Sequence, residues 1–193
     1  MSGTKTLYLN GIAVGTVPAT GDHIRDMEVA RAFFAERGII HEPTLVQAMF
    51  RQAVSFATTS SYLYDRDLKS APRNGFSVAP FVVNSALSLE LYLKTLAQMH
   101  SGPAAHRHKL VKLFDALPAQ ARETIKASVA KWGDRHVADV AGVRSVLSDL
   151  NNAFVEWRYC YELERTNAVR IGATITAMKV LHEVCTESGG SNL

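Results

Sequence analysis

The sequence has 193 residues, of which 47% are hydrophobic and 20% charged, and its formal net charge is +3. These proportions exclude an intrinsically disordered chain, and the length suits one domain with room for a small appendage. No charged leader followed by an apolar stretch opens the sequence, and we find no apolar run of the roughly 20 residues that a membrane helix needs, so we expect a cytoplasmic protein with no membrane partner.

The first elements that the sequence predicts are two strands joined at Asn10-Gly11. β-prone residues from Thr4 to Pro18 flank this dipeptide, which favours the tight turn of a hairpin because both turn positions need a positive φ. A two-stranded hairpin is marginally stable by itself in water. We therefore expect it to lie on the helices or to pair with another chain, which makes it a candidate dimer contact. Asp22 is then placed to cap a helix that ends at Gly38.

Beyond Gly38 the hydrophobic pattern is almost entirely helical, with breaks at proline and glycine positions. The predicted helices span residues 43–68, 78–100, 106–117, 118–132, 139–165 and 167–187. The fold class is therefore mainly α, an antiparallel helical bundle with a short N-terminal β-hairpin. We expect an appendage at residues 1–41, the bundle at 42–187 and a flexible tail at 188–193.

Charged residues interrupt the apolar faces of two predicted helices. Glu90 and Lys94 lie four residues apart on the helix over 78–100, with the acid first, the better order for a helical ion pair. Arg158 borders the apolar face of the helix over 139–165, and Glu162 continues the same edge. A charge in an apolar environment is costly unless it is paired, so Glu90 or Glu162 is expected to hold Arg158.

Two interpretations of this polar seam remain open. In the structural one, Glu90, Lys94, Arg158 and Glu162 form an internal clamp that fixes the register of the helices. In the functional one, Arg158 faces a cleft and binds phosphate, and Tyr159 or Tyr161 stacks on a base.

A local excess of positive charge lies between His100 and His136. This stretch holds seven lysines and arginines against three acids, a net charge of +4, together with four of the seven histidines. Such a stretch favours a polyanionic partner, although a solvated helical face explains it equally well.

The segments Leu89-Glu-Leu-Tyr-Leu-Lys94, His108-Lys-Leu-Val-Lys-Leu113 and Trp157-Arg-Tyr159 resemble the HEPN superfamily of small helical domains. The resemblance covers roughly residues 45–187. It implies a helical bundle that dimerises. It also implies either an RNase of toxin–antitoxin or defence systems or a noncatalytic protein that binds RNA, nucleotides or partner proteins.

The RNase signature of that superfamily is an arginine followed, after four to six residues, by a histidine. No arginine in this sequence has a histidine at that spacing, and the positions after Arg158 hold Leu163, Glu164 and Arg165. Arg37 and His41 have only three residues between them. If Arg158 acts, it is therefore expected to bind rather than to cleave.

No recognisable spacing of cysteines, histidines and carboxylates predicts a metal site, and no glycine-rich phosphate loop or cofactor motif is present. His182 shares an apolar face with Ile175, Met178 and Cys185, so it is expected to be a core residue with one hydrogen-bond partner. His182 is also the best substitute for the missing catalytic histidine. The two cysteines, Cys160 and Cys185, both lie in helical patterns, and we expect both to be reduced.

Three functions follow as hypotheses. The favoured one is a noncatalytic, HEPN-like binding or regulatory protein, a homodimer that binds RNA, a nucleotide or a partner protein without metal or cofactor. Its expected ligand-binding residues are Arg158, Tyr159, Tyr161, Glu90, Lys94, His108, Arg107 and Lys112. The second is a divergent, metal-independent RNase, with the catalytic candidates Arg158, His108, His182 and Glu162. The third is an interaction protein that docks through its hairpin and has no nucleic-acid ligand.

Overall fold

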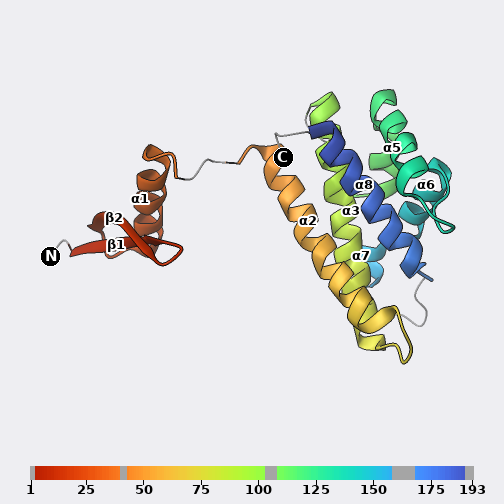
Figure 1. Ribbon diagram of the computed structural model, residues 1–193, viewed down its shortest axis with the longest axis horizontal. Coiled ribbons are helices and arrows are strands. Elements are labelled where there is room, and N and C mark those ends of the chain that lie inside the picture. The colour runs from red at the N-terminus through yellow and green to blue at the C-terminus, as the bar shows by residue number, and fades with distance from the viewer. Residues whose placement is uncertain (1–2, 40–42, 103–107, 158–167, 190–193) are drawn as a thin grey trace. The chain divides into compact units, whose positions relative to one another are not determined.

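The computed structural model describes residues 3–39, 43–102, 108–157 and 168–189. The chain divides into two compact units, Met1–Thr44 and Leu45–Leu193, which we call the N-terminal unit and the helical unit. The division lies a few residues beyond the expected end of the appendage at residue 41. The predicted fold class is confirmed: the chain is mainly α with one short antiparallel hairpin (Figure 1).

The N-terminal unit consists of β1 (Gly3–Leu9), β2 (Ile12–Ala19) and α1 (His23–Glu36). Asn10 and Gly11 connect the strands with φ angles of +50° and +82°, so the predicted turn is confirmed. Leu9 pairs with Ile12 at this end of the ladder, and Gly3 pairs with Ala19 at the other. The side chain of Asp22 accepts hydrogen bonds from the backbone of Ile24 and Arg25 and begins α1 as predicted.

Two contacts fasten α1 to the hairpin. The Phe33 ring lies so close to Gly15 that a Cβ atom there would come within 2.2 Å of the ring, so any larger residue would displace it. Asp26 is buried at 7% exposure, and its carboxylate accepts hydrogen bonds from the backbone N–H of Thr20 (2.6 Å) and the Lys5 ammonium. A single buried carboxylate therefore joins α1 to β1 and to the residue that follows β2.

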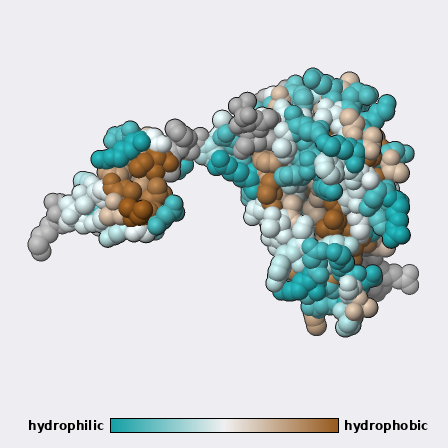
Figure 2. All heavy atoms as spheres, viewed as in Figure 1, coloured by the Kyte–Doolittle hydropathy of each residue, from teal (hydrophilic) through white to brown (hydrophobic). Residues whose placement is uncertain are grey.

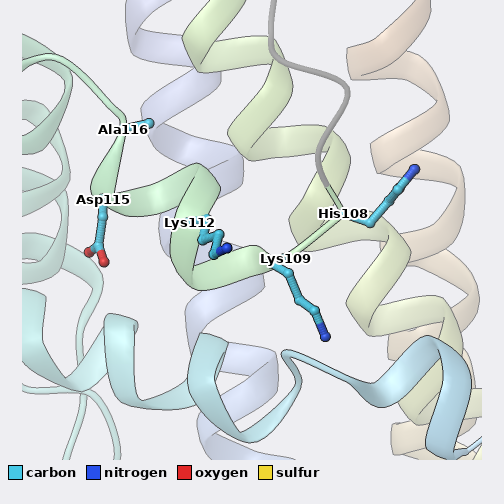
Figure 3. A pocket seen from close by; sticks show the side chains of 5 residues that line it. All are labelled: His108, Lys109, Lys112, Asp115 and Ala116. Carbon is cyan, nitrogen blue, oxygen red and sulfur yellow. The ribbon is translucent and has the colours of Figure 1, made fainter.

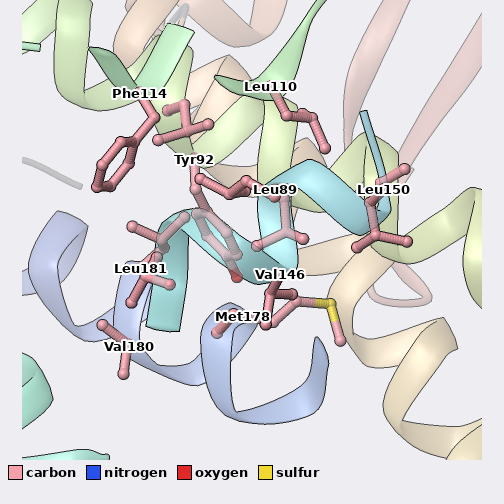
Figure 4. Close-up of a cluster of buried hydrophobic side chains, with 14 of the residues drawn as sticks. Leu89, Tyr92, Leu110, Phe114, Val146, Leu150, Met178, Val180 and Leu181 are labelled. Atoms are coloured by element: carbon pink, nitrogen blue, oxygen red, sulfur yellow. The ribbon is translucent and has the colours of Figure 1, made fainter. Parts of the chain in front are cut away.

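The helical unit is built around α3 (Val78–Ser101), which packs along α2 (Leu45–Leu63) on one side and α8 (Ile171–Gly189) on another (Figure 1). The turn Tyr64–Leu68 extends α2, and Gly75–Ser77 precedes α3. The remaining helices of the described residues are α4 (Leu110–Asp115), α5 (Ala119–Trp132), α6 (Val140–Asp149) and α7 (Ala153–Glu156). Side chains from α3, α4, α6 and α8 converge in one continuous core (Figure 4), in which Leu89, Tyr92 and Leu181 are almost completely buried.

The prediction of one continuous helix over residues 139–165 is wrong. Helix α6 ends at Asp149, a turn follows at Asn151 and Asn152, and α7 begins at Ala153. The physical reason is tertiary: the amides of Asn151 and Asn152 reach the start of α4, where the first accepts a hydrogen bond from Val111 N (3.2 Å) and the second from Lys109 Nζ. Residues 158–167, with Arg158, Tyr159, Tyr161 and Glu162, lie outside the described residues.

By length and hydropathy alone, residues 75–100 would suffice for a membrane span, contrary to the sequence expectation. This segment is α3, and half of its most apolar window is buried inside the bundle. The buried core helix of a bundle meets the same criterion, so the segment is weak evidence for a membrane span.

Candidate functional site

Glu90 is the centre of the polar seam. Its Oε1 atom accepts a hydrogen bond from Lys94 Nζ at 2.7 Å, which confirms the predicted pair one helical turn apart. The same oxygen lies 3.0 Å from His108 Nδ1. The Glu90 and Lys94 side chains are only 14% and 17% exposed, whereas the His108 ring is 83% exposed. Glu90 thus anchors one nearly buried cation and orients one imidazole that faces solvent.

The segment that carries His108 is held from two sides. It precedes α4, whose first residue is Leu110, so His108 lies before the first helical turn rather than within it as the sequence predicted. Glu90 on α3 holds His108, and the turn after α6 holds the next residues through Asn152 and Asn151. Contacts to α3 and to the turn after α6 therefore orient His108 and Lys109 at the start of α4.

An open surface pocket of about 670 Å³ lies beside this segment (Figure 3). His108, Lys109, Lys112, Asp115 and Ala116 line it, and all five are exposed. Figure 3 shows Asp115 at the far end of α4 from His108, with Lys112 between them. We call the pocket and the helix that borders it the α4 surface.

Among the described residues of the α4 surface, the one carboxylate, Asp115, is already neutralised. Arg144 donates from Nε and Nη2 to the two oxygens of Asp115, each at 2.8 Å. This forked pair lowers the pKa of Asp115 below its usual range despite slight burial, and nearby Arg122 adds to the effect. The charges left available to a ligand are therefore those of Lys109 and Lys112.

The described members of the expected ligand-binding set do come together. Glu90, Lys94 and His108 are in direct contact, and Lys112 shares the pocket with His108. Arg107, Arg158, Tyr159 and Tyr161 lie outside the described residues, as does the catalytic candidate Glu162. Whether Arg158 completes the Glu90 clamp therefore stays a prediction.

His182 lies in a different environment. Its Nδ1 atom is 3.1 Å from the hydroxyl of Tyr92, and Phe50 stacks on its ring with a centroid distance of 5.5 Å. Burial raises the pKa of Tyr92 above its ordinary value. The hydrogen bond to Tyr92 agrees with the expected single partner, but His182 is half-buried beside the core rather than a core residue as the sequence predicted. The small apolar pocket that it lines, about 390 Å³, does not include His108.

Sequence reasoning missed Lys109, Asn151 and Asn152 as parts of this site. Two consecutive asparagines in the middle of a predicted helix were the available signal, because asparagine has low helix propensity and its amide competes for backbone hydrogen bonds. Among the described residues, no three histidine, cysteine or carboxylate side chains are grouped so that they could hold a metal ion.

No protein-family model matches this chain, and no curated protein or solved structure matches it significantly. The geometry of the α4 surface and the residues that surround it are therefore the basis for a functional assignment.

Proposed function

We propose that this protein is a noncatalytic, HEPN-like module that binds RNA through the α4 surface. The observation that carries the proposal is a segment, bonded to Glu90 and Asn152, that places His108, Lys109 and Lys112 around one open pocket. Among the described residues that line this pocket the one carboxylate, Asp115, is paired with Arg144. Cations fixed in this way and exposed to solvent suit phosphate groups along a nucleic-acid backbone. In keeping with the HEPN resemblance, such a module would serve in a toxin–antitoxin or defence system.

The strength of the expected binding depends on salt. Each phosphate that a protein cation neutralises on a single strand contributes about 0.7 to the slope of log Kd against log salt concentration. Lys109 and Lys112 together therefore give a slope of about 1.4, and binding weakens as salt rises.

The test is fluorescence anisotropy of a labelled single-stranded RNA over a salt series. Lys112→Gln should weaken binding and lower the slope by about 0.7. Lys126→Gln is the matched control, because Lys126 is an equally exposed helical lysine on α5 that pairs with Glu123 outside the α4 surface. Absence of salt-dependent binding, or equal effects of the two substitutions, would refute the proposal.

A second candidate function, a divergent metal-independent RNase, is favoured by one observation. Glu90 orients His108 through Nδ1 and leaves the exposed Nε2 edge of the ring free to take a proton from a substrate hydroxyl. A histidine oriented by a carboxylate is the usual geometry of a general base.

Cleavage of a structured RNA pool in the presence of a chelator tests this alternative. RNase activity through His108 should fall at least a hundredfold in His108→Ala and drop partially in Glu90→Gln, since a general base contributes about 10²–10⁴ in rate. The control is His136→Ala, which changes a histidine outside the α4 surface. Undetectable cleavage, or cleavage that survives His108→Ala, excludes this mechanism.

A third candidate, docking through the hairpin, is favoured by exposed apolar side chains on the N-terminal unit. Tyr8, Ile12, Ile24 and Met27 are each more than half exposed, and Figure 2 shows apolar residues gathered on this unit. Large exposed apolar groups in one small unit are typical of an interaction surface. In the expected homodimer, the partner that docks on this surface is a second copy of the chain.

A further inference from the structure

A second pocket of the helical unit, of about 630 Å³, gathers more positive charge than the α4 surface. It is formed by the turn that extends α2, the connection between α5 and α6, and the beginning of α8. Its volume is in the range of small-molecule sites. Among the described residues, five basic ones line it and no carboxylate does: Lys69, Arg73, Arg135, His136 and Arg170.

The five basic residues differ in whether a carboxylate already neutralises their charge. Arg170 donates to Asp149 (2.7 Å) and to the Ser145 hydroxyl, and Lys69 forms an exposed pair with Asp65 at 3.2 Å. Arg135 Nε donates to His136 Nε2 at 3.3 Å, and neither Arg73 nor Arg135 has a carboxylate partner among the described residues. Two guanidinium groups from separate segments are thus left with uncompensated charge beside one pocket.

The segments that carry these two arginines are fixed in place. Asp134 accepts hydrogen bonds from the backbone of His136 (2.7 Å) and from the Thr176 hydroxyl on α8 (2.8 Å). Although partial burial raises the pKa of Asp134, these bonds outweigh it and hold that pKa below the usual range. On the opposite side, the backbone N–H of Asn74 donates to Asp67 O at 3.0 Å, directly after Arg73.

The same pocket also has an apolar side. Leu68 is buried at its base, and Tyr64, Val169, Ile171 and Ala173 complete the lining. A purely inorganic anion would leave this surface without a partner, whereas a ligand with an apolar or aromatic body would cover it. The lining therefore combines exposed basic side chains with an apolar wall.

We propose that this pocket binds a small organic phosphate, a phosphate monoester carried on an apolar or aromatic body. The forked guanidinium groups of Arg73 and Arg135 hold the phosphate oxygens, because a guanidinium matches their geometry with two parallel hydrogen bonds. Tyr64 and Leu68 contact the body. Arg170 and Lys69 contribute to the positive field at the rim, and the first turn of α8 adds its backbone N–H groups to that field.

Isothermal titration calorimetry of the full chain with phenyl phosphate tests the proposal. Phenyl phosphate should bind with one site per chain, and inorganic phosphate should bind at least about tenfold more weakly because it cannot use the apolar wall. Arg73→Gln and Arg135→Gln should each weaken phenyl phosphate at least about tenfold. Arg51→Gln, at an exposed arginine of α2 outside the pocket, should leave it unchanged.

Four outcomes would overturn the proposal: no binding of phenyl phosphate at millimolar concentration, equal binding of inorganic phosphate, an equal loss in Arg51→Gln, or full binding in both pocket variants. All three arginines are exposed, and far-UV circular dichroism checks that each variant is folded. Lys112→Gln separates this site from the α4 surface: it should weaken RNA and leave phenyl phosphate unaffected. Loss of phenyl phosphate binding in Lys112→Gln would also count against a separate pocket.

Discussion

Asp26 shows how one residue can couple the stability of a small unit to pH. Hydrogen bonds from Lys5 and from the Thr20 backbone and hydroxyl lower the pKa of Asp26 from 3.8 to about 2, against a smaller opposing effect of burial. Because the carboxylate form is favoured in the folded state, its stabilisation is complete above pH 3.8 and is lost as the pH falls through about 2.

We therefore expect the N-terminal unit to lose stability between about pH 4 and pH 2, and Asp26→Asn to lower its stability at neutral pH and remove that part of the pH dependence. Amide hydrogen exchange of residues 3–39 measures this unit separately from the helical unit. Glu28→Gln, at an exposed acid of the same helix, is the control and should behave as the wild type. Identical exchange in Asp26→Asn and the wild type would contradict the role of Asp26.

The contact between Tyr92 and His182 makes a second prediction at this scale. Tyr92→Phe removes the hydroxyl that contacts His182 Nδ1 and leaves that half-buried nitrogen without its partner, so the free energy of unfolding should fall by about 1 kcal/mol. Urea denaturation measures the change. Tyr62→Phe is the comparison, because the Tyr62 hydroxyl bonds Arg66 at the exposed surface, where such a bond contributes little. An equal loss of stability in both variants would show that the buried Tyr92 contact stabilises the fold no more than the exposed Tyr62 contact does.

At the scale of elements, local signals in the sequence predicted what local interactions determine. Asn10-Gly11 forms the hairpin turn, Asp22 caps α1, and Pro118 precedes α5. In each case the residues responsible lie within a few positions of the element that they begin or end. The Glu90–Lys94 pair belongs to the same class, because its spacing along one helix fixes the contact.

The parts that sequence reasoning missed depend on residues far apart in the chain. Asn151 ends a helical stretch because it bonds α4, forty residues earlier, and His108 joins Glu90 only after α3 and α4 have packed together. Arg73 and Arg135 meet at one pocket through a turn and a connection that have no distinctive motif. Periodicity describes each helix singly, so it could not predict which loops would become neighbours.

The break between α6 and α7 can be tested directly. Asn151→Ala removes the acceptor of the Val111 N–H bond at the start of α4, and it should lower the free energy of unfolding by about 1 kcal/mol. It should also weaken RNA binding, since α4 carries Lys112. Chemical denaturation and the anisotropy assay measure the two effects. Ser148→Ala, an exposed position on α6, should change neither, and unaltered stability in Asn151→Ala would show that the break has another cause.

At the scale of the whole molecule, the two units differ in how much they bury. Every residue of the continuous core lies between Ala53 and Cys185, within the helical unit. In the described part of the N-terminal unit, Val17 is the one buried apolar residue, and Asp26 is the buried polar one. Burial of apolar side chains thus stabilises the helical unit more than the N-terminal unit.

A chain of residues 45–193 should therefore fold by itself, with a helical circular-dichroism spectrum and a cooperative thermal transition close to that of the full protein. Loss of cooperative unfolding in this shorter chain would show that the helical unit needs the hairpin. Light scattering of both chains tests the expected dimer contact: a dimer that becomes monomeric on removal of residues 1–44 supports it, and an unchanged mass removes that role from the hairpin.

The presence of two separately packed units in one polypeptide also affects encounter rates. Because residues 1–44 and 45–193 are covalently joined, a molecule bound by the hairpin would meet Lys109 and Lys112 at an effective concentration set by the connecting chain. Cleaving the chain at this junction would produce two separate fragments that meet only by diffusion.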